Sequence, residues 1–499
     1  MTMMNYSLTI LEMAVIASGL GVLLLDLWAP FGLKRQLGYA AAAALGFILL
    51  LSFSSFVDSG SAATAFNGMF VQDGLSLFFK RFFLVAAILV LILSVEFAER
   101  IATGISEYYA LILFALAGMM FAASANDFSL LFVSVELITV TFYVLVSFQR
   151  NRLASLEAGV KYLILGALSS AFMVFGIALI FGTTGRMNFT ALAGTASQFS
   201  NDRLFLLGLL LVLVGLGFKI AAFPVQIWAP DVYQGSPLPT TAFLAVGSKA
   251  AGFALVLRVL FGAVPGVTAH WTKLLMAISA ITILYGTLCA LPQRNLKRLL
   301  GYSSISNAGY LLLGVAALSH AGQSAVLYFL AGYLFTVLAA FLVIGLVMRQ
   351  VEGQDISALA GLNQRSPFLA ASMTLSMVSL AGIPPLAGFF GKFLLLKAAV
   401  EQGASDPAYY WLVAVAIAGV IISLYYYFGV VRAIYWPADA ADLSPILISP
   451  PIKVSMWFCV LGMVLLGLFP NSLVNTADQA VAVLGTGAQT TAAPPLAGR

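Results

Sequence analysis

Long apolar runs separated by short polar turns make up most of the chain. A helix of about 20 predominantly apolar residues spans the hydrocarbon core of a bilayer, and the runs are of that order. We therefore predict fourteen membrane-spanning helices. Their ranges are 8–28, 38–57, 77–95, 108–123, 127–148, 159–182, 204–229, 238–261, 271–290, 300–318, 324–348, 367–397, 408–434 and 454–474.

The composition agrees with this pattern and excludes a soluble fold. Of the 499 residues, 62% are hydrophobic and 9% are charged, whereas soluble domains carry about 25% charged residues. So few charges could not cover the surface of a soluble protein of this length. The fold class that we predict is an all-α polytopic membrane protein embedded in the lipid bilayer, without a separate soluble domain.

Basic residues in the loops predict the orientation, because cytoplasmic loops carry an excess of lysine and arginine. With the N-terminus outside, the inside loops collect Lys34, Arg35, Arg100, Arg150, Arg152, Arg294, Lys297, Arg298, Arg349, Arg365, Arg432 and Lys453. The outside segments hold Lys80, Arg81, Arg186, Arg203, Lys273 and Arg499. We therefore predict that both termini face the periplasm. The scattered basic residues lack aromatic interleaving, so we predict no nucleic-acid partner.

The two ends of the chain differ in character. Glu12 and Asp26 lie within the first apolar run and no basic region precedes it, so we predict a retained membrane helix and not a removable signal peptide. The tail after residue 475 is weakly charged and interrupted by proline and glycine. For this tail we predict a loose end without chemistry.

The chain carries few residues that could hold a metal or a cofactor. Its two cysteines, Cys289 and Cys459, are far apart, and its two histidines are His270 and His320. Iron–sulfur clusters and structural zinc need closely spaced ligands. A glycine-rich turn of the kind that cradles nucleotides is also missing from the sequence. We predict that the chain binds no metal and no cofactor of its own.

Four ionisable residues stand inside apolar runs: Glu136, Lys219, Lys249 and Lys392. A charge at the bilayer centre costs about 2.5–3.5 kcal/mol on the insertion scale, so residues that remain there are functional candidates. A long lysine side chain can also extend to the headgroups, which would explain one such residue. It explains three lysines and a glutamate together less well.

Prolines predict that two of the helices are interrupted. Pro224 follows Lys219 closely, and Pro384 and Pro385 shortly precede Lys392. Proline removes a backbone donor and clashes with the preceding turn, so a break is expected at both places. Broken helices at corresponding places in two halves indicate an inverted-repeat transporter. Two ordinary proline kinks are the alternative, which leaves the neighbouring lysines unexplained.

Polar residues also recur at helical spacing beside these charges. Thr139 and Tyr143 share a face with Glu136, and a second stripe consists of Ser303, Ser306, Asn307 and Tyr310. Such stripes line chains of water or form interhelical hydrogen bonds. If the helices that carry Glu136 and Lys219 are adjacent, a lysine whose acidic partner approaches or withdraws would act as a proton switch.

Four segments give the chain its resemblance to a known family. They are residues 157–185 (EAGVKYLILGALSSAFMVFGIALIFGTTG), 218–259 (which includes FKIAAFPVQIWAP and VGSKAAG), 295–314 (NLKRLLGYSSISNAGYLLLG) and 381–393 (AGIPPLAGFFGKF). The chain resembles the antiporter-like membrane subunits of proton-pumping NADH–quinone oxidoreductase, respiratory complex I. Within this family it is most similar to the subunit N branch, because Lys392 stands where the subunit M branch would be expected to have glutamate.

The resemblance implies a fold and a role for each buried charge. It implies three N-terminal helices in residues 1–107, two inverted five-helix repeats in 108–262 and 263–436, and a final helix and tail in 437–499. Glu136 and Lys219 would form a Glu–Lys pair, Lys249 would pass protons along a central hydrophilic axis, and Lys392 would stand on the second broken helix. Gln226 and Asn307 replace histidines of many relatives, so a relay through those positions is in doubt.

The predicted function is proton translocation in the bacterial inner membrane, coupled to quinone reduction in partner subunits. The resemblance implies that other membrane-arm subunits are partners and that these partners bind NADH, flavin, iron–sulfur clusters and quinone. A subunit of a multisubunit cation/proton antiporter is the alternative, since it shares the fold and the lysines. A scaffold that only holds its neighbours is a third hypothesis.

Overall fold

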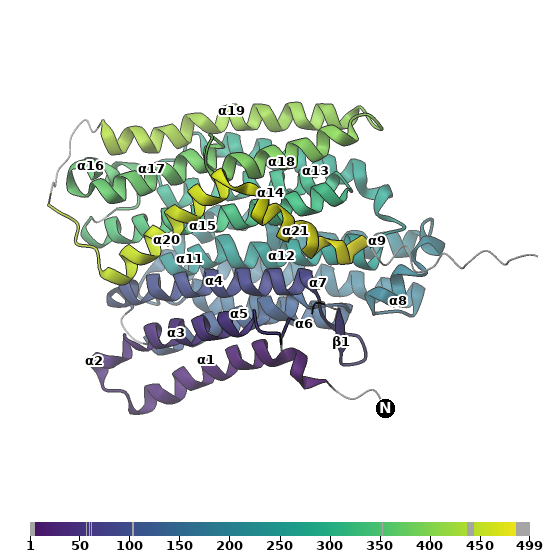
Figure 1. The fold of residues 1–499 in the computed structure, drawn as a ribbon, viewed down its shortest axis with the longest axis horizontal. Coiled ribbons are helices and arrows are strands. Elements are labelled where there is room, and N and C mark those ends of the chain that lie inside the picture. Colours follow the sequence, from purple (N-terminus) through teal and green to yellow (C-terminus); the bar gives the residue numbers. More distant parts are fainter. Residues whose placement is uncertain are drawn as a thin grey trace, which may run out of the picture.

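The apolar runs fold as helices, since in lipid every backbone polar group must be bonded within its own segment. The computed structural model describes residues 5–55, 57, 58, 60, 62–101, 104–351, 353–436 and 444–485. Figure 1 shows a sheaf of long helices that runs from α1 at one edge to α19 at the opposite edge. A small antiparallel pair of strands, β1 (Ala63–Ala65) and β2 (Phe70–Gln72), lies in a connection near one end of the bundle.

Within the described residues, twelve helical segments are long and apolar enough to cross a membrane. Ten of them are α4 to α7, α9, α13 to α15, α19 and α20. Another is α1 with the short turn before it, and the last is the continuous helix Leu238–Ala263. The bounds are α1 (Ile10–Trp28), α4 (Gly74–Phe97), α5 (Ile105–Ala123), α6 (Phe128–Val146), α7 (Leu153–Thr184), α9 (Arg203–Ile220), α13 (Thr272–Ala290), α14 (Leu296–Ala316), α15 (His320–Gln350), α19 (Ala408–Tyr435) and α20 (Pro450–Leu468).

The other helices are shorter. They are α2 (Phe31–Lys34), α3 (Leu37–Leu51), α8 (Phe189–Ala193), α10 (Trp228–Gly235), α16 (Leu362–Arg365), α17 (Pro367–Ala381), α18 (Ala387–Gln402) and α21 (Pro470–Gly485). The predicted spans 38–57 and 367–397 correspond to α3 and to the pair α17 and α18. Each of the fourteen predicted ranges therefore contains helix, although the count of fourteen crossings stays a prediction.

The helix Leu238–Ala263 changes its winding twice. It consists of α11 (Leu238–Phe243), a π-helical turn at Leu244–Ser248, α12 (Lys249–Leu257) and a second π-helical turn at Arg258–Ala263. Single π-helical turns inside helices are frequent at functional sites. Lys249 is the first residue after one such turn, and Arg258 is the first residue of the other.

Two spanning segments are interrupted at the predicted prolines. The first break separates α9 from α10 at residues 221–227, which include Pro224. The second separates α17 from α18 at residues 382–386, which include Pro384 and Pro385. Both breaks are only partly covered by protein, because Pro224, Pro384 and Pro385 are exposed whereas Gln226 and Leu386 are buried.

The core of the bundle lies around two helices that are buried along their whole length. The most apolar stretches of Leu238–Ala263 and of α14 are fully buried, whereas in those of α7 and α19 fewer than half of the residues are buried. In Figure 1 α12 and α14 accordingly lie in the interior of the sheaf, between α1 and α19. Lysines on the buried helices are surrounded by protein on all sides.

The segment after residue 475 corrects one prediction. Residues 470–485 form α21, which packs against α4 and α15, so the expectation of a loose end is wrong for this part. Ala477 and Val481 are completely buried in that contact. The residues after 485, including the predicted outside charge Arg499, lie outside the described residues.

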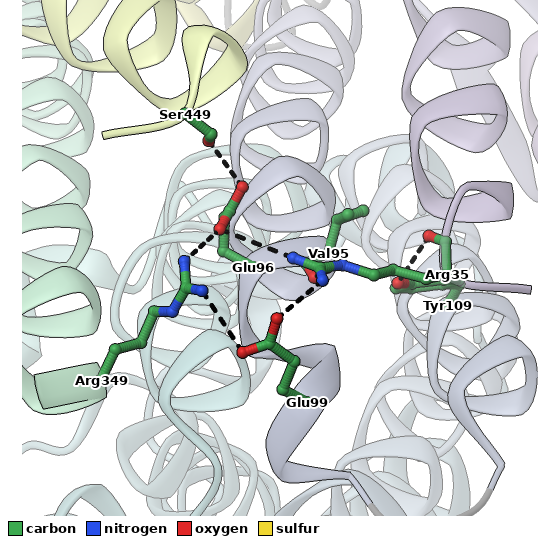
Figure 2. Close-up of polar contacts among 7 residues, drawn as sticks. All are labelled: Arg35, Val95, Glu96, Glu99, Tyr109, Arg349 and Ser449. Atoms are coloured by element: carbon green, nitrogen blue, oxygen red, sulfur yellow. Dashed lines mark hydrogen bonds and ion pairs between the residues drawn. The ribbon is translucent and has the colours of Figure 1, made fainter. Parts of the chain in front are cut away.

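A cluster of charges joins the end of α4 to three other parts of the chain (Figure 2). Glu96 Oε2 lies 2.6 Å from Arg349 Nη1 on α15 and 3.7 Å from Arg35 Nη2 in the connection between α2 and α3. Ser449, just before α20, donates a hydrogen bond of 2.6 Å to Glu96 Oε1. Glu99 also pairs with both arginines, at 2.8 and 3.3 Å. The N-terminal helices are thereby fixed to the second half of the chain.

Three of the basic residues that the sequence assigns to loops are buried in helices: Lys80, Lys297 and, on α16, Arg365. Lys80 lies in the second turn of α4 and is 0% exposed, and Lys297 is in the first turn of α14 and is 2% exposed. Lys297 Nζ donates a hydrogen bond of 2.6 Å to Ser236 O. The loop assignment of these two lysines is therefore wrong, because hydropathy alone does not distinguish a helix end at the surface from one covered by neighbouring segments.

Candidate functional site

Lys219 occupies the last turn of the first half-helix, α9. The helix ends at Ile220, and Ala221 follows in a left-handed conformation with φ of 59°. A cation in the last turn is favoured by the helix dipole. The side chain is buried, and its Nζ donates a hydrogen bond to Thr139 Oγ1 on α6. The fold therefore brings together the two helices predicted to share a proton switch.

Glu136 lies one turn before Thr139 on the same helix. Its carboxylate accepts a hydrogen bond from Ser170 Oγ on α7. The ion pairs among the described residues do not include Glu136 with Lys219. In this arrangement each of the two charged groups has a neutral hydroxyl partner, Ser170 for Glu136 and Thr139 for Lys219.

Lys249 faces the second buried helix. Its Nζ donates hydrogen bonds to both the hydroxyl and the carbonyl oxygen of Ser304 on α14. Ser304 Oγ also lies 2.8 Å from the Tyr233 hydroxyl on α10, which is the second half of the first broken helix. The ring of Tyr333 on α15 lies 5.8 Å from the ammonium. Lys249 is therefore connected to three helices beyond its own.

The helices of Lys219 and Lys249 are in close contact. Gly252, one turn after Lys249, has no side chain, and a Cβ there would lie 2.7 Å from Ile220 Cγ2 and 3.2 Å from Lys219 Cβ. Contacts under 3.0 Å essentially do not occur for a real Cβ. Glycine at this position thus allows the backbone that carries Lys249 to pack directly against the end of α9.

Lys392 stands in the second turn of α18 and bonds to the end of α17. Its Nζ donates a hydrogen bond of 2.7 Å to Leu380 O, and Ala381 O lies 3.5 Å away. These carbonyls belong to the last turn of α17, where no intrahelical donor is available. The Tyr310 ring lies 4.9 Å from the ammonium. Lys392 thus donates hydrogen bonds to carbonyl groups at the end of α17 that have no donor within their own helix.

Helix α14 connects the neighbourhoods of Lys249 and Lys392. Ser304, which bonds Lys249, and Tyr310, whose ring faces Lys392, are six residues apart on this helix, or about 9 Å along its axis. The order of contacts is thus Glu136 and Lys219, then Lys249, then Lys392. The three predicted lysines are buried and Glu136 is partly buried, and the contacts of all four lie within the helix bundle.

The predicted stripe on α14 forms hydrogen bonds between helices. Ser303 Oγ lies 2.6 Å from the Tyr427 hydroxyl on α19, and Ser306 Oγ lies 2.8 Å from Thr287 Oγ1 on α13. The Tyr310 hydroxyl donates to Ala416 O on α19 at 2.9 Å, whereas Asn307 Nδ2 donates to Ser303 O within α14 itself. The bonds of Ser303, Ser306 and Tyr310 agree with the interhelical interpretation of the stripe.

The stripe of Glu136, Thr139 and Tyr143 on α6 differs from the one on α14, because one of its hydroxyl groups is unpaired among the described residues. Within the described part of the chain, the buried Tyr143 hydroxyl has no hydrogen-bond partner, and neither does Gln226 Oε1 in the first break. Gly166 on α7 makes room for the tyrosine, since a Cβ there would lie 2.2 Å from its hydroxyl oxygen. Buried polar atoms are normally hydrogen-bonded, so these two are exceptions within the described part of the chain.

Several residues of this path are not apparent from the sequence pattern. Ser304 bonds Lys249 and Ser170 bonds Glu136, whereas Tyr233 bonds Ser304. Ser304 sits between two residues of the predicted stripe, Ser303 and Ser306. Small hydroxyl residues are frequent at helix contacts. Only the position of the opposing lysine distinguishes Ser304 from its neighbours.

The described residues contain no group of three or more histidine, cysteine, aspartate or glutamate side chains that could hold a metal ion. They do contain three buried lysines, two of them beside the breaks, in a protein with many helices long and apolar enough to cross a membrane. These features define a multi-pass membrane protein with buried charges.

Comparison with known proteins identifies the family. The family described as NADH:quinone oxidoreductase/Mrp antiporter, transmembrane, matches residues 125–423. The NADH-quinone oxidoreductase subunit N of Moorella thermoacetica is 39% identical to the chain over 475 residues, with 95% of this chain and 98% of that protein covered. The chain belongs to this family of membrane subunits.

Solved structures share the fold. A chain of respiratory complex I from Thermus thermophilus with bound aureothin has 32% sequence identity and a TM-score of 0.77, with coverage of 93% of this chain and 99% of that one. A chain of the Mrp complex from a Dietzia species has a TM-score of 0.84 at 22% identity, with 97% and 98% coverage. The second likeness concerns the fold alone.

Proposed function

We propose that this chain translocates protons as a subunit N of NADH–quinone oxidoreductase, in the membrane arm of the complex. The observation that carries the proposal is the set of three buried lysines, Lys219, Lys249 and Lys392, whose partners lie on neighbouring helices, with Glu136 one turn from the Thr139 that bonds Lys219. Ionisable residues within the membrane are expensive to retain, so a set of four indicates a path for ions or protons.

Rearrangement of the bonds of these residues would move the proton. Lys219 would exchange its hydrogen bond to Thr139 for a contact with the Glu136 carboxylate. Lys249, which is bonded to Ser304 on α14, would accept a proton and pass it on. Lys392 would accept or release that proton at the second break. Moving one charge against 100 mV requires about 2.3 kcal/mol. One hydrogen bond to a charged group contributes about 1.5–3 kcal/mol, so exchange of a single such bond is sufficient in scale.

The chain would depend on partner subunits for its energy source. The relatives are subunits of a quinone oxidoreductase, and a neighbouring structure is respiratory complex I. We propose that other membrane-arm subunits surround this chain and that NADH, flavin, iron–sulfur clusters and quinone are bound by partners. The extensive exposed apolar faces of α6 and α7, with Val133 and Phe175 among them, suit contact with lipid or with such subunits.

The segment lengths support the proposed division into two five-helix repeats. The third helix of each, α7 and α15, has 32 and 31 residues, and the fourth is the broken one in both. The proposed repeats are residues 108–262 and 263–436, between an N-terminal unit at 1–107 and a final part at 437–499. We further propose a bacterial inner membrane location with both termini in the periplasm.

The test is proton pumping by the assembled complex in liposomes. We expect Lys219→Ala and Lys249→Ala to lower the number of protons pumped per NADH oxidised while the complex still assembles. Lys397→Ala is a matched control, because Lys397 lies on α18 near Lys392 but pairs with Glu401 at 3.7 Å on the surface. Undiminished pumping in both axis variants would contradict the proposal.

The alternative functions predict other results. A cation/proton antiporter subunit would exchange sodium for protons in vesicles without any NADH or quinone oxidation. A pure scaffold would leave pumping intact after neutralisation of Glu136, Lys219, Lys249 and Lys392 together. Copurification with flavin and iron–sulfur proteins would favour the oxidoreductase over both.

A further inference from the structure

A cavity of about 640 Å³ lies beside the start of α4, away from the proposed proton path. Its walls come from α3, α4, α15, α20 and α21, with part of the connection after α3. On α4 the lining extends from the N-cap residue Asp73 to Val85. That stretch of helix is about 18 Å long, close to the roughly 15 Å of hydrocarbon in one leaflet of a bilayer. The cavity therefore has the length of an acyl chain in one leaflet.

Helix α21, which lies beside α4 (Figure 1), has two faces that are largely apolar. One face, with Ala477 and Val481, is completely buried. The neighbouring face, with Leu473, Thr476 and Ala480, lines the cavity. Apolar faces that the protein itself does not cover mark contacts with lipid or with a partner. The cavity face of α21 therefore favours an apolar occupant.

The walls that α15 and α20 contribute are apolar as well. Ala331, Leu334 and Phe335 line the cavity from α15, and Leu466 lines it from α20. Phe82 on α4 adds an aromatic ring to the lining. A polar group in such surroundings would lose its hydrogen bonds to water without replacement. A hydrocarbon chain has no polar atom to leave unbonded and fits this part of the cavity.

One pair of opposite charges stands at the cavity wall with free hydrogen-bonding atoms. Arg81 Nη2 on α4 donates to Asp58 Oδ2 at 2.8 Å and to Ser52 O at 2.7 Å. The Phe53 ring lies 4.1 Å from the guanidinium. Among the residues that the structure describes, Arg81 Nη1 and Asp58 Oδ1 have no hydrogen-bond partner, and both side chains are partly exposed. The pair thus offers one donor group and one acceptor to a ligand.

Two other polar residues of the wall are already bonded within the protein. Gln72 Nε2 donates to Val57 O at 2.7 Å. Both Asp73 oxygens accept hydrogen bonds from Arg258, at 2.8 and 3.1 Å. Gln72 and Asp73 therefore complete the wall of the cavity, and the polar part of a ligand has better partners in Arg81 and Asp58.

Lys80, the residue before Arg81, faces away from the cavity. Its Nζ lies 2.7 Å from Glu12 Oε1 on α1, and both of these side chains are 0% exposed. Lys80 accordingly contributes nothing to the cavity lining. The cation that a ligand in the cavity can reach on this part of α4 is therefore Arg81.

We propose that the cavity binds one phospholipid with a zwitterionic headgroup that carries a primary ammonium, as in phosphatidylethanolamine. Its phosphate accepts hydrogen bonds from Arg81 Nη1, and its ammonium donates to Asp58 Oδ1, so both contacts are charge-assisted. One acyl chain lies along α4, between α15 and α21. A phosphatidylglycerol headgroup would leave Asp58 without a cation, and a choline headgroup has no N–H group to donate.

The experiment is photolabelling of the assembled complex in phosphatidylcholine liposomes that contain a trace of a diazirine-bearing phospholipid. Three probes share one photoreactive acyl chain and differ in headgroup: phosphatidylethanolamine, phosphatidylglycerol and phosphatidylcholine. Mass spectrometry of the peptides gives the share of the label on this chain that falls on α21. One hydrogen bond to a charged group corresponds to about tenfold in affinity. We expect the share for the phosphatidylethanolamine probe to exceed the other two by about this factor.

Four variants separate headgroup binding from chain binding. Arg81→Gln removes the phosphate donor and should lower the α21 share for all three probes. Asp58→Asn keeps Arg81 and removes the carboxylate, so it should shift the preference towards phosphatidylglycerol. Ala331→Phe places a ring in the apolar part and should lower all three shares without a change of charge. Glu401→Gln is the matched control, because it removes an exposed carboxylate on α18 and should change nothing.

Equal α21 shares for the three probes in the wild type would indicate bulk lipid alone and would overturn the proposal. So would shares that stay the same in Arg81→Gln and Asp58→Asn, or an α21 without label, which would assign the cavity to a partner segment. If Arg81→Gln does not assemble, Asp58→Asn and Ala331→Phe still decide between these results. The labelling does not depend on pumping, so a failure of the proposed function would leave it unaffected.

Discussion

The two broken helices each hold one buried lysine, but they hold it in opposite ways. Lys219 precedes its break and reaches across to a side chain on another helix, Thr139. Lys392 follows its break and turns back to the carbonyls at the end of the preceding half-helix, at 2.7 Å from Leu380 O. One ammonium is bound by a side chain that can rotate, and the other by a backbone that cannot.

The packing around the two breaks also differs, because the second break is tightly packed and the first has a cavity beside it. At the second break a Cβ on Gly388 would lie 1.9 Å from Ser379 O, so the two halves touch through glycine. At the first break a small cavity of about 70 Å³ lies beside Phe223 and Pro224. We infer that the backbone at the first break can change conformation, whereas the backbone at the second break holds Lys392 in a fixed position.

The largest effect should come from enlarging Gly388. Gly388→Val places a branched side chain where the backbone of α17 passes, and overpacking of this kind costs about 1–3 kcal/mol. We expect a lower thermal unfolding temperature of the purified complex and loss of Lys392-dependent pumping. The matched change at the first break is Gly217→Ala, whose Cβ would meet Val225 Cγ2 at 3.3 Å and should cost much less. Equal losses in the two variants would contradict the comparison.

The next largest effect should come from removing the lysines themselves. Lys392→Met leaves the buried Leu380 carbonyl without its donor, which costs about 1–3 kcal/mol. Lys219→Met leaves Thr139 bonded to Val135 O at 2.5 Å, so no polar atom of α6 loses its last partner. Thermal unfolding should therefore be affected more by the change at Lys392. A greater loss of stability in Lys219→Met would mean that the first break is the rigid one.

A smaller effect is expected when Tyr310 is changed. Tyr310→Phe removes the hydroxyl that donates to Ala416 O but keeps the ring 4.9 Å from Lys392, at a cost of about 1 kcal/mol. Tyr310→Leu removes the ring as well, and with it a cation–π contact of about 0.5–2 kcal/mol. The two variants should differ in pumping rate, which proteoliposome assays measure. Identical pumping would show that the ring does not act on the lysine.

The smallest effect is expected at the surface end of α18. Lys397→Ala breaks an exposed pair with Glu401, and such pairs contribute about 0.3–0.5 kcal/mol. Thermal unfolding and pumping should both stay close to those of the wild type. A large loss here would indicate that the whole of α18, and not Lys392, responds to any change of charge.

Much of the site could be predicted from the sequence, because a charged residue or a proline stands out within an apolar run. A lysine or a glutamate within an apolar run is visible without knowledge of its neighbours, and so is a proline that interrupts a helix. The contacts of Lys249 were not visible in this way. Its acceptor Ser304 is one of several small hydroxyl residues on α14, and 55 residues separate it from the lysine.

Charges near helix ends were the least predictable from the sequence. Lys80 and Lys297 stand close to the ends of apolar runs, which is where loop charges also occur. Their burial depends on what covers the helix end, and for Lys80 the covering helix is α1, far away in the sequence. The same limitation applies to α21, whose amphipathic sequence packs as a helix only because α4 and α15 offer a surface for it.

The sequence by itself determined the fold class, the approximate places of the helices, the two breaks and the four charged residues of the proposed path. These features follow from the cost of placing each residue in lipid, which depends on the residue and its near neighbours. Only the tertiary structure decided that Lys219 bonds Thr139, that Lys392 bonds the end of α17 and that Glu12 meets Lys80. Such contacts join helices that are distant in the chain, and an apolar helix face does not by itself specify which helix it packs against.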